Sequence, residues 1–169
     1  MPGQSIGKTF NYGYPGSFSR SGDCVIANRV LQSTDTNNIN FGDPVILNSN
    51  NTISALLATG TAATFAGVAV REVKQADQYS AQTALAYKPG QPVDFITRGS
   101  VMVTVNAGTP TAGGLVYIRI ATPAAGKPIG GFEAAADGAN TIQLTNAEFT
   151  TGYKDSNNIA EITLLSRQA

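Results

Sequence analysis

Short apolar stretches alternate along the chain with polar segments rich in Gly, Asn, Pro and Ser. Inside several stretches, apolar and polar side chains alternate at the two-residue period of a half-buried β-strand. The pattern predicts about nine to eleven short strands and at most one short helix, arranged as an all-β sandwich or barrel. The segments that fit it are residues 23–33, 45–47, 66–73, 93–97, 101–105, 115–120, 127–132, 141–145 and 159–168.

The clearest strand pattern lies in "KPGQPVDFITRGSVMVTVNAG", residues 88–108. Two apolar runs flank Arg98-Gly99-Ser100, and glycine readily adopts the positive φ that tight hairpin turns need. We therefore expect a β-hairpin that turns at Arg98-Gly99. In its second strand Val101, Val103 and Val105 share the face opposite Met102 and Thr104. The segment holds nothing reactive, so we interpret it as a rigid scaffold.

Residues 1–22 differ from the rest of the chain and are predicted to form an N-terminal arm, followed by a single β domain over residues 23–169. The arm contains four of the 13 aromatic side chains, and its Gly and Pro residues disfavour a helix. In an extended chain Phe10, Tyr12 and Tyr14 would share one face. The arm could be a strand of the chain's own sheet. We favour an arm that docks on another chain, with its aromatic residues at the interface: Phe10, Tyr12, Tyr14 and Phe18.

Charge and composition exclude several classes of partner. Charged residues make up 13% of the chain, the net charge is zero, and the 11 Lys and Arg form no basic run. A nucleic-acid-binding protein needs a clustered basic face, so no nucleic acid is expected as a partner. No apolar stretch is long enough for a membrane-spanning helix, and the N-terminus lacks the apolar region of a signal peptide, so no membrane is expected either.

Residues that carry out chemistry are scarce. The chain has no histidine, which excludes Ser-His-Asp and Cys-His catalysis and histidine-based zinc binding. Cys24 lies in an apolar stretch and is interpreted as a small core residue. Most of the 11 acidic residues stand beside Gly, Asn, Pro or Ser, where they cap turns. The sequence therefore predicts no catalytic residue, no cofactor, no metal site and no enzyme. A pair of carboxylates brought together by folding, as in a glycosidase, stays open.

Three motifs in a fixed order resemble a known family. They are "FAGVAVREVKQ" (65–75), "YKPGQPVDFITRGSVMVTV" (87–105) and "AGGLVYIRI" (112–120). The series is similar to that of the capsid cement, or decoration, proteins of tailed double-stranded DNA bacteriophages. The opening "PGQSIG…YPG" and the strand "NRV" are also similar to that family.

The resemblance implies a small β protein, jelly-roll-like in some members, that is made in the host cytoplasm and becomes part of the virion. It would bind the outer surface of the mature head and lock neighbouring major capsid protein subunits together. Its implied partners are the major capsid protein and further copies of itself, as a dimer or a trimer. The alternatives are another β-rich virion component, such as a tail, neck or receptor-binding module, and a carbohydrate-binding protein, which the lack of Trp disfavours.

Overall fold

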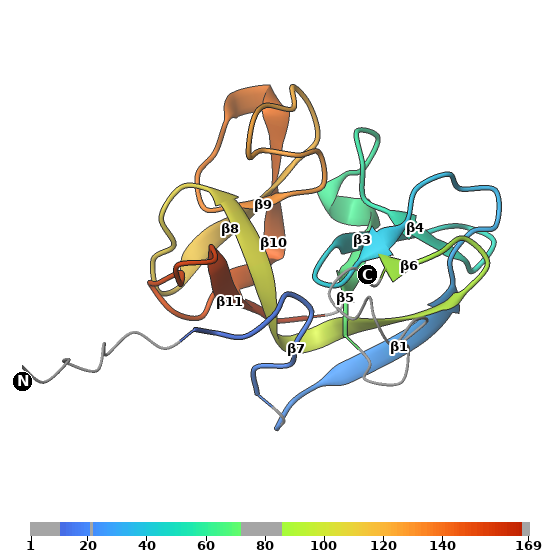
Figure 1. Cartoon of the computed structure of the whole chain (residues 1–169), viewed down its shortest axis with the longest axis horizontal. Coiled ribbons are helices and arrows are strands. Elements are labelled where there is room, and N and C mark those ends of the chain that lie inside the picture. Colours follow the sequence, from blue (N-terminus) through green and yellow to red (C-terminus); the bar gives the residue numbers. More distant parts are fainter. Residues whose placement is uncertain (1–10, 21, 72–85, 167–169) are drawn as a thin grey trace, which may run out of the picture.

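The computed structural model describes residues 11–20, 22–71 and 86–166, and it confirms the all-β prediction (Figure 1). These residues form eleven strands, within the predicted number, and two 3-10 turns, η1 (Ala62–Thr64) and η2 (Gly138–Asn140), where at most one short helix was expected. The strands are β1 (Val25–Val30), β2 (Ile39–Asn40), β3 (Pro44–Leu47), β4 (Ile53–Ala55), β5 (Phe65–Ala69), β6 (Ala86–Tyr87), β7 (Pro92–Ala107), β8 (Gly114–Arg119), β9 (Phe132–Glu133), β10 (Thr141–Phe149) and β11 (Ile159–Leu164).

The second half of β7 belongs to a closed barrel. It pairs with β11 along one edge and with β9 along the other, and the order β11–β10–β8–β9 completes the circuit. The β7–β9 pair is parallel, and the other pairs of the circuit are antiparallel. The barrel form of the predicted sandwich or barrel is therefore present, while the jelly-roll arrangement implied by the resemblance stays a prediction.

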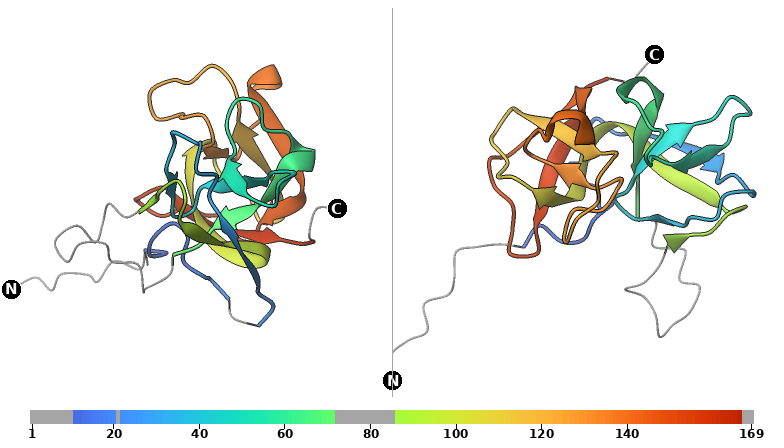
Figure 2. Two further views of the ribbon diagram at one scale, coloured as in Figure 1. Left: turned by 90° about the vertical axis from the view of Figure 1, so that its right-hand side faces the viewer. Right: turned by 90° about the horizontal axis from the view of Figure 1, so that it is seen from above.

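The first half of β7 belongs to a second sheet, which we call the side sheet. It runs β1–β7–β5–β3–β4, and a bridge between Leu31 and Ile53 brings β4 next to the end of β1. Figures 1 and 2 show the barrel and the side sheet next to each other, joined by β7. The β3–β4 hairpin turns at the polar sequence Ser49-Asn50-Asn51-Thr52, where Asn51 has a φ of 65°.

The hairpin predicted at Arg98-Gly99 is wrong, because β7 runs through this point as one strand of 16 residues. Gly99 does have a positive φ, 115°, but Ser100 returns to the ladder opposite Thr163. The chain keeps its direction because the two flanking segments pair with different neighbours, β1 before Gly99 and β11 after it. A single left-handed residue bends a strand, whereas a two-residue hairpin needs both central residues in a turn conformation.

Two clusters of buried side chains stabilise the fold. The larger fills the barrel and includes Val101, Val103 and Val105, which share one face as predicted and are fully buried. It also takes in Val68 and Ile96 from the side sheet, so the two sheets share one core. The smaller cluster lies in the curl of the side sheet, around Leu31, Ile39, Val45, Ile53, Ala69, Tyr87, Val93 and Phe95.

Candidate protein interface

Residues 11–20, which we call the docked arm, pack on the described domain, and residues 16–19 lie along the edge of β7 opposite β11. The Gly16 N–H donates to the Met102 carbonyl (2.8 Å), and the Met102 N–H donates to the Ser17 carbonyl (3.0 Å). A third bond runs from the Ser19 N–H to the Ser100 carbonyl at 3.2 Å. These bonds add the arm to the sheet as a short extra strand, and Met102, on the face opposite Val101 and Val103, is 8% exposed.

The far end of the docked arm is attached to β11 through Glu161. Arg20 Nε donates to Glu161 Oε1 at 2.8 Å, and the Ser19 hydroxyl donates to the same carboxylate. Glu161 stands between the apolar residues Ala160 and Ile162 in its strand, and it is 3% exposed where Ser19 and Arg20 contact it. Burial by itself would raise the pKa of Glu161, yet the hydrogen bonds from Arg20 and Ser19 outweigh burial and hold that pKa below its ordinary value.

The four aromatic residues predicted at an interface differ in their surroundings. Phe10 lies outside the described residues. Tyr12 is half-buried against the barrel, where its ring lies 5.9 Å from the Tyr153 ring and its N–H donates to Asp155 Oδ2 at 3.0 Å. Tyr14 is 59% exposed and Phe18 39% exposed. The isolated chain does not test whether these rings contact another chain, so the interface stays a prediction.

Tyr12 and Tyr14 do not share one face of the arm, as they would in a fully extended chain. Gly13 between them has a φ of 99°, outside the extended range. As a result Tyr12 contacts the barrel, while the Tyr14 ring faces Arg71, two residues after the end of β5, with the guanidinium carbon 4.8 Å from the ring centre. Such a cation–π contact holds an exposed ring in one orientation.

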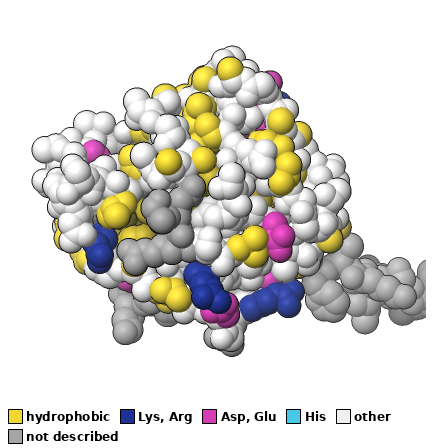
Figure 3. Space-filling model, turned by 180° about the vertical axis from the view of Figure 1, so that it is seen from behind, with side chains coloured by type: hydrophobic (Ala, Val, Ile, Leu, Met, Phe, Trp, Pro, Cys, Tyr) yellow, Lys and Arg dark blue, Asp and Glu magenta, His cyan; other side chains and the backbone are white. Residues whose placement is uncertain are grey.

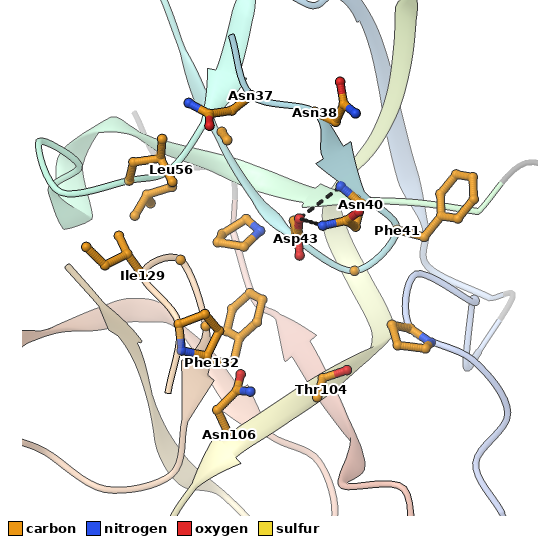
Figure 4. A pocket seen from close by; sticks show the side chains of 18 residues that line it. Asn37, Asn38, Asn40, Phe41, Asp43, Leu56, Thr104, Asn106, Ile129 and Phe132 are labelled. Atoms are coloured by element: carbon orange, nitrogen blue, oxygen red, sulfur yellow. Dashed lines mark hydrogen bonds between the residues drawn. The ribbon is translucent and has the colours of Figure 1, made fainter. Parts of the chain in front are cut away.

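A pocket of about 290 Å³ lies where the side sheet meets the barrel (Figure 4). Asn40, at the end of β2, and Asp43, just before β3, line one side of it, and Thr104, Asn106 and Phe132 line it from the barrel. Among the described residues that line the pocket, Asp43 is the one that carries a charge, so these residues do not include the pair of carboxylates that a glycosidase needs. Both the N–H and the side-chain amide of Asn40 donate to Asp43 Oδ2 at 2.9 Å, yet burial outweighs these bonds and raises the pKa of Asp43.

Sequence reasoning missed a buried ion-pair cluster around Arg119, at the end of β8. Arg119 and Glu133 are each 1% exposed, and Arg119 Nη2 also lies 2.7 Å from Asp137 Oδ2. The hydrogen bonds to Glu133 and Asp137 raise the pKa of Arg119, and the bond from Arg119 lowers that of Asp137. Arg119 also donates to the carbonyls of Ala121 and Thr122, so the cluster fixes the loop between β8 and β9. The one sequence signal was an arginine inside the apolar run "LVYIRI", since a buried arginine needs acidic partners.

Cys24 and the possible metal ligands of the described residues were the other candidates for a chemical site. Cys24 is half-buried against the barrel core, and burial together with the charge of Asp23 raises the pKa of its thiol. Within the described ranges, no three His, Cys, Asp or Glu residues gather as metal ligands would. In the same part of the chain, no helix has the length and apolar character needed to cross a membrane. On the face opposite that of Figure 1, hydrophobic side chains lie in small separate groups (Figure 3).

Comparison with known proteins places this fold in a family. Residues 3–164 match the family model described as XM1 gp53 minor capsid protein. The chain belongs to this family of minor capsid proteins. Among solved structures it matches a chain of "The capsid of Myoviridae Phage XM1" with a TM-score of 0.66 and 17% identity, over 99% of this chain and 98% of that chain. No curated protein matches the chain. At this identity the solved structure shows a shared fold.

Family membership confirms the resemblance to phage capsid-associated proteins and places the protein in the virion as a minor capsid protein. Its role is structural, and the family is not a class of enzymes. A minor capsid protein binds the capsid, so the expected association with the head is confirmed at this coarser level.

Proposed function

We propose that the protein is a cement protein, which binds the outer surface of the mature head and links neighbouring major capsid protein subunits. The observation that carries the proposal is the docked arm. Its backbone is hydrogen-bonded to β7, while it presents the rings of Tyr14 and Phe18 to solvent, 59% and 39% exposed. An exposed aromatic side chain on an ordered backbone is the usual anchor of a protein–protein interface.

The arm suits this role because its conformation is already fixed. Three hydrogen bonds to β7 and the ion pair between Arg20 and Glu161 hold it before any partner arrives. A segment ordered in advance does not lose its conformational freedom on binding, which strengthens binding without new contacts. Tyr14 is further oriented by Arg71.

The barrel supplies the rigidity that a cement protein needs. All of its strands are paired on both edges along part of their length, and its core residues are fully buried. A rigid body that contacts two capsid subunits resists their separation. Because many symmetric copies act on one head, each contact can be modest and the total effect on the head still large.

The proposal is tested with heads that lack the protein and purified protein added back. We expect depleted heads to rupture at a lower temperature, and under milder osmotic shock, than heads with the protein restored. Equal stability of depleted and restored heads would contradict the cement role.

The contribution of the arm is tested by the double variant Tyr14→Ala/Phe18→Ala. We expect it to bind depleted heads at least about tenfold more weakly, equivalent to about 1.4 kcal/mol. The matched control is Leu47→Ala/Leu115→Ala, which removes two side chains of comparable exposure, 45% and 50%, away from the arm. If both double variants bind as the unmodified protein does, the arm is not the capsid-binding surface.

A further inference from the structure

The strand β1 lies at the open edge of the side sheet. It pairs with β7 along one side, and among the described residues no strand pairs with its other side between residues 26 and 30 (Figure 1). The free stretch is bounded at one end by a register shift between Val25 and Ile26, and at the other by β4, where the Gln32 N–H donates to the Ile53 carbonyl. Unpaired strand edges readily pair with another chain.

The backbone groups that point to this free edge can be identified. The Leu31 N–H donates to the Gln91 carbonyl on the β7 side, and backbone direction alternates along a strand, so Arg29 and Ala27 also face β7. Ile26, Asn28 and Val30 therefore direct their N–H and C=O groups away from the sheet. The Asn28 carbonyl accepts one bond from the Arg29 side chain, and a carbonyl oxygen can accept a second.

The side chains of the same three residues favour pairing. Ile26 is 44% exposed and Val30 46% exposed, and both are β-branched residues that suit a strand interior. Proteins usually protect a free edge with Lys or Pro. The segment from Val25 to Val30 contains neither, and its one charged residue, Arg29, is engaged with Asn51 Oδ1 at 2.8 Å.

We propose that β1 pairs with β1 of a second copy of this chain in an antiparallel, two-fold symmetric arrangement centred on Asn28. Because only Ile26, Asn28 and Val30 face the edge, this register alone pairs all three. Ile26 of one copy then lies opposite Val30 of the other, which makes an apolar pair at each end. Asn28 lies on the two-fold axis, opposite Asn28 of the other copy. Because asparagine is uncharged, this position avoids the repulsion that two identical charged residues would cause there.

A second copy fits this edge better than an unrelated strand for two reasons. The exposed triplet, with apolar residues at both ends and an uncharged polar residue between them, is complementary to itself when reversed. The chain has zero net charge, so two copies approach without long-range repulsion. This dimer is independent of how the protein contacts the head.

Disulfide trapping tests the register, in a background where Cys24 is replaced by Ala. Asn28→Cys places two thiols opposite each other, with Cα atoms about 5.5 Å apart, within the range of a disulfide. Val30→Cys is the matched control, because Val30 is exposed too but its Cα would lie about 14 Å from the Cα of its own copy. Under mild oxidation we expect linked dimers for Asn28→Cys and almost none for Val30→Cys. Equal linkage of both variants, or none for Asn28→Cys, would overturn the proposal.

Sedimentation velocity at rising protein concentration provides the second test. We expect the unmodified chain to form dimers, the double variant Ile26→Lys/Val30→Lys to stay monomeric, and the control Leu47→Lys/Leu115→Lys to dimerise normally. Cooperative thermal unfolding of each variant confirms that it is folded. A folded Ile26→Lys/Val30→Lys protein that still dimerises would show that β1 is not the contact. Head binding is measured separately, so a failure of the dimer leaves the cement role untouched.

Discussion

The barrel and the side sheet use the same long strand, but they leave different surfaces open. The barrel closes on itself through β7, β11, β10, β8 and β9, so its strands offer little free edge to a partner. The side sheet curls until β4 meets the end of β1, and then leaves the edge of β1 free from residue 26 to residue 30. The barrel therefore carries the docked arm, while the side sheet presents the free edge of β1 and borders the pocket that contains Asp43.

The largest expected difference between the two regions is in their ion pairs. Arg119→Met in the barrel leaves Glu133 buried without its cation, so we expect a loss of about 3–5 kcal/mol in the free energy of unfolding. Arg98→Met removes the partner of Asp23 beside the side sheet, where both side chains are more than half exposed, and we expect a loss of at most about 1 kcal/mol. Urea denaturation of the two variants measures both changes.

A second variant separates the lost ion pair from lost packing. Arg119→Met/Glu133→Met replaces both buried charges by apolar side chains, and Asp137, which is 46% exposed, can be solvated alone. We expect the double variant to recover most of the stability that the single variant loses. If the single variant unfolds like the unmodified protein, the cluster does not stabilise the barrel.

The next largest effect is expected where β7 crosses from one region to the other. A side chain at Gly99 would place its Cβ 2.4 Å from the Asp23 carbonyl oxygen, at a φ of 115°. Gly99→Ala should therefore cost about 3 kcal/mol, combining strain and overlap. The control is Gly113→Ala, which also has a positive φ, 70°, but no atom within 4 Å, and should cost about 1 kcal/mol. Thermal unfolding that ranks the two variants the other way would show that crowding at the crossing is unimportant.

The sequence predicts the positions of strands better than it predicts which strands pair. The strands β1, β8 and β11 lie at the segments predicted from the sequence, 23–33, 115–120 and 159–168, because alternation is a local property. The path of the chain at Gly99 was not predicted, because a positive φ fits both a hairpin and a bent strand. Pairing with β11, about 60 residues later, decides between the two. Local pattern therefore identifies strands, while the choice of partners depends on distant segments.

The candidate interface shows the same division. The concentration of aromatic residues before residue 22 marked Tyr14 and Phe18, and both are exposed. The burial of Glu161 could not be predicted, because Ser19 and Arg20, which cover it, lie more than 140 positions earlier. The free edge of β1 was also invisible, since Ile26 and Val30 are the residues expected of any interior strand.

The attachment of the arm to the barrel should respond to acid, an effect on the order of 1 kcal/mol. The folded-state pKa of Glu161 lies below its ordinary value of 4.5, so its bonds contribute stability above that value, and the contribution is lost as the pH falls through the folded-state pKa. Arg20 is 64% exposed, which keeps the effect small. We expect Glu161→Gln to be less stable at neutral pH and to lose part of the acid dependence of unfolding. An unchanged pH profile would show that the arm is held by its backbone bonds to β7 alone.

The smallest effect is expected at the pocket between the two regions, and it has the opposite sign. Burial raises the pKa of Asp43, so its ionised form is disfavoured in the folded protein, and stability should fall as the pH rises through this raised value. Asp43→Asn can still accept the bonds from Asn40 without carrying the charge. We expect this variant to gain up to about 1 kcal/mol at neutral pH, and nothing at a pH where the carboxyl is protonated. Asp35→Asn, outside the pocket, is the control and should leave the free energy of unfolding unchanged at both pH values. A loss of stability in Asp43→Asn would mean that the carboxylate stabilises the fold. A gain would mean that the chain keeps a destabilising charge at the junction of its two sheets, as recognition sites often do.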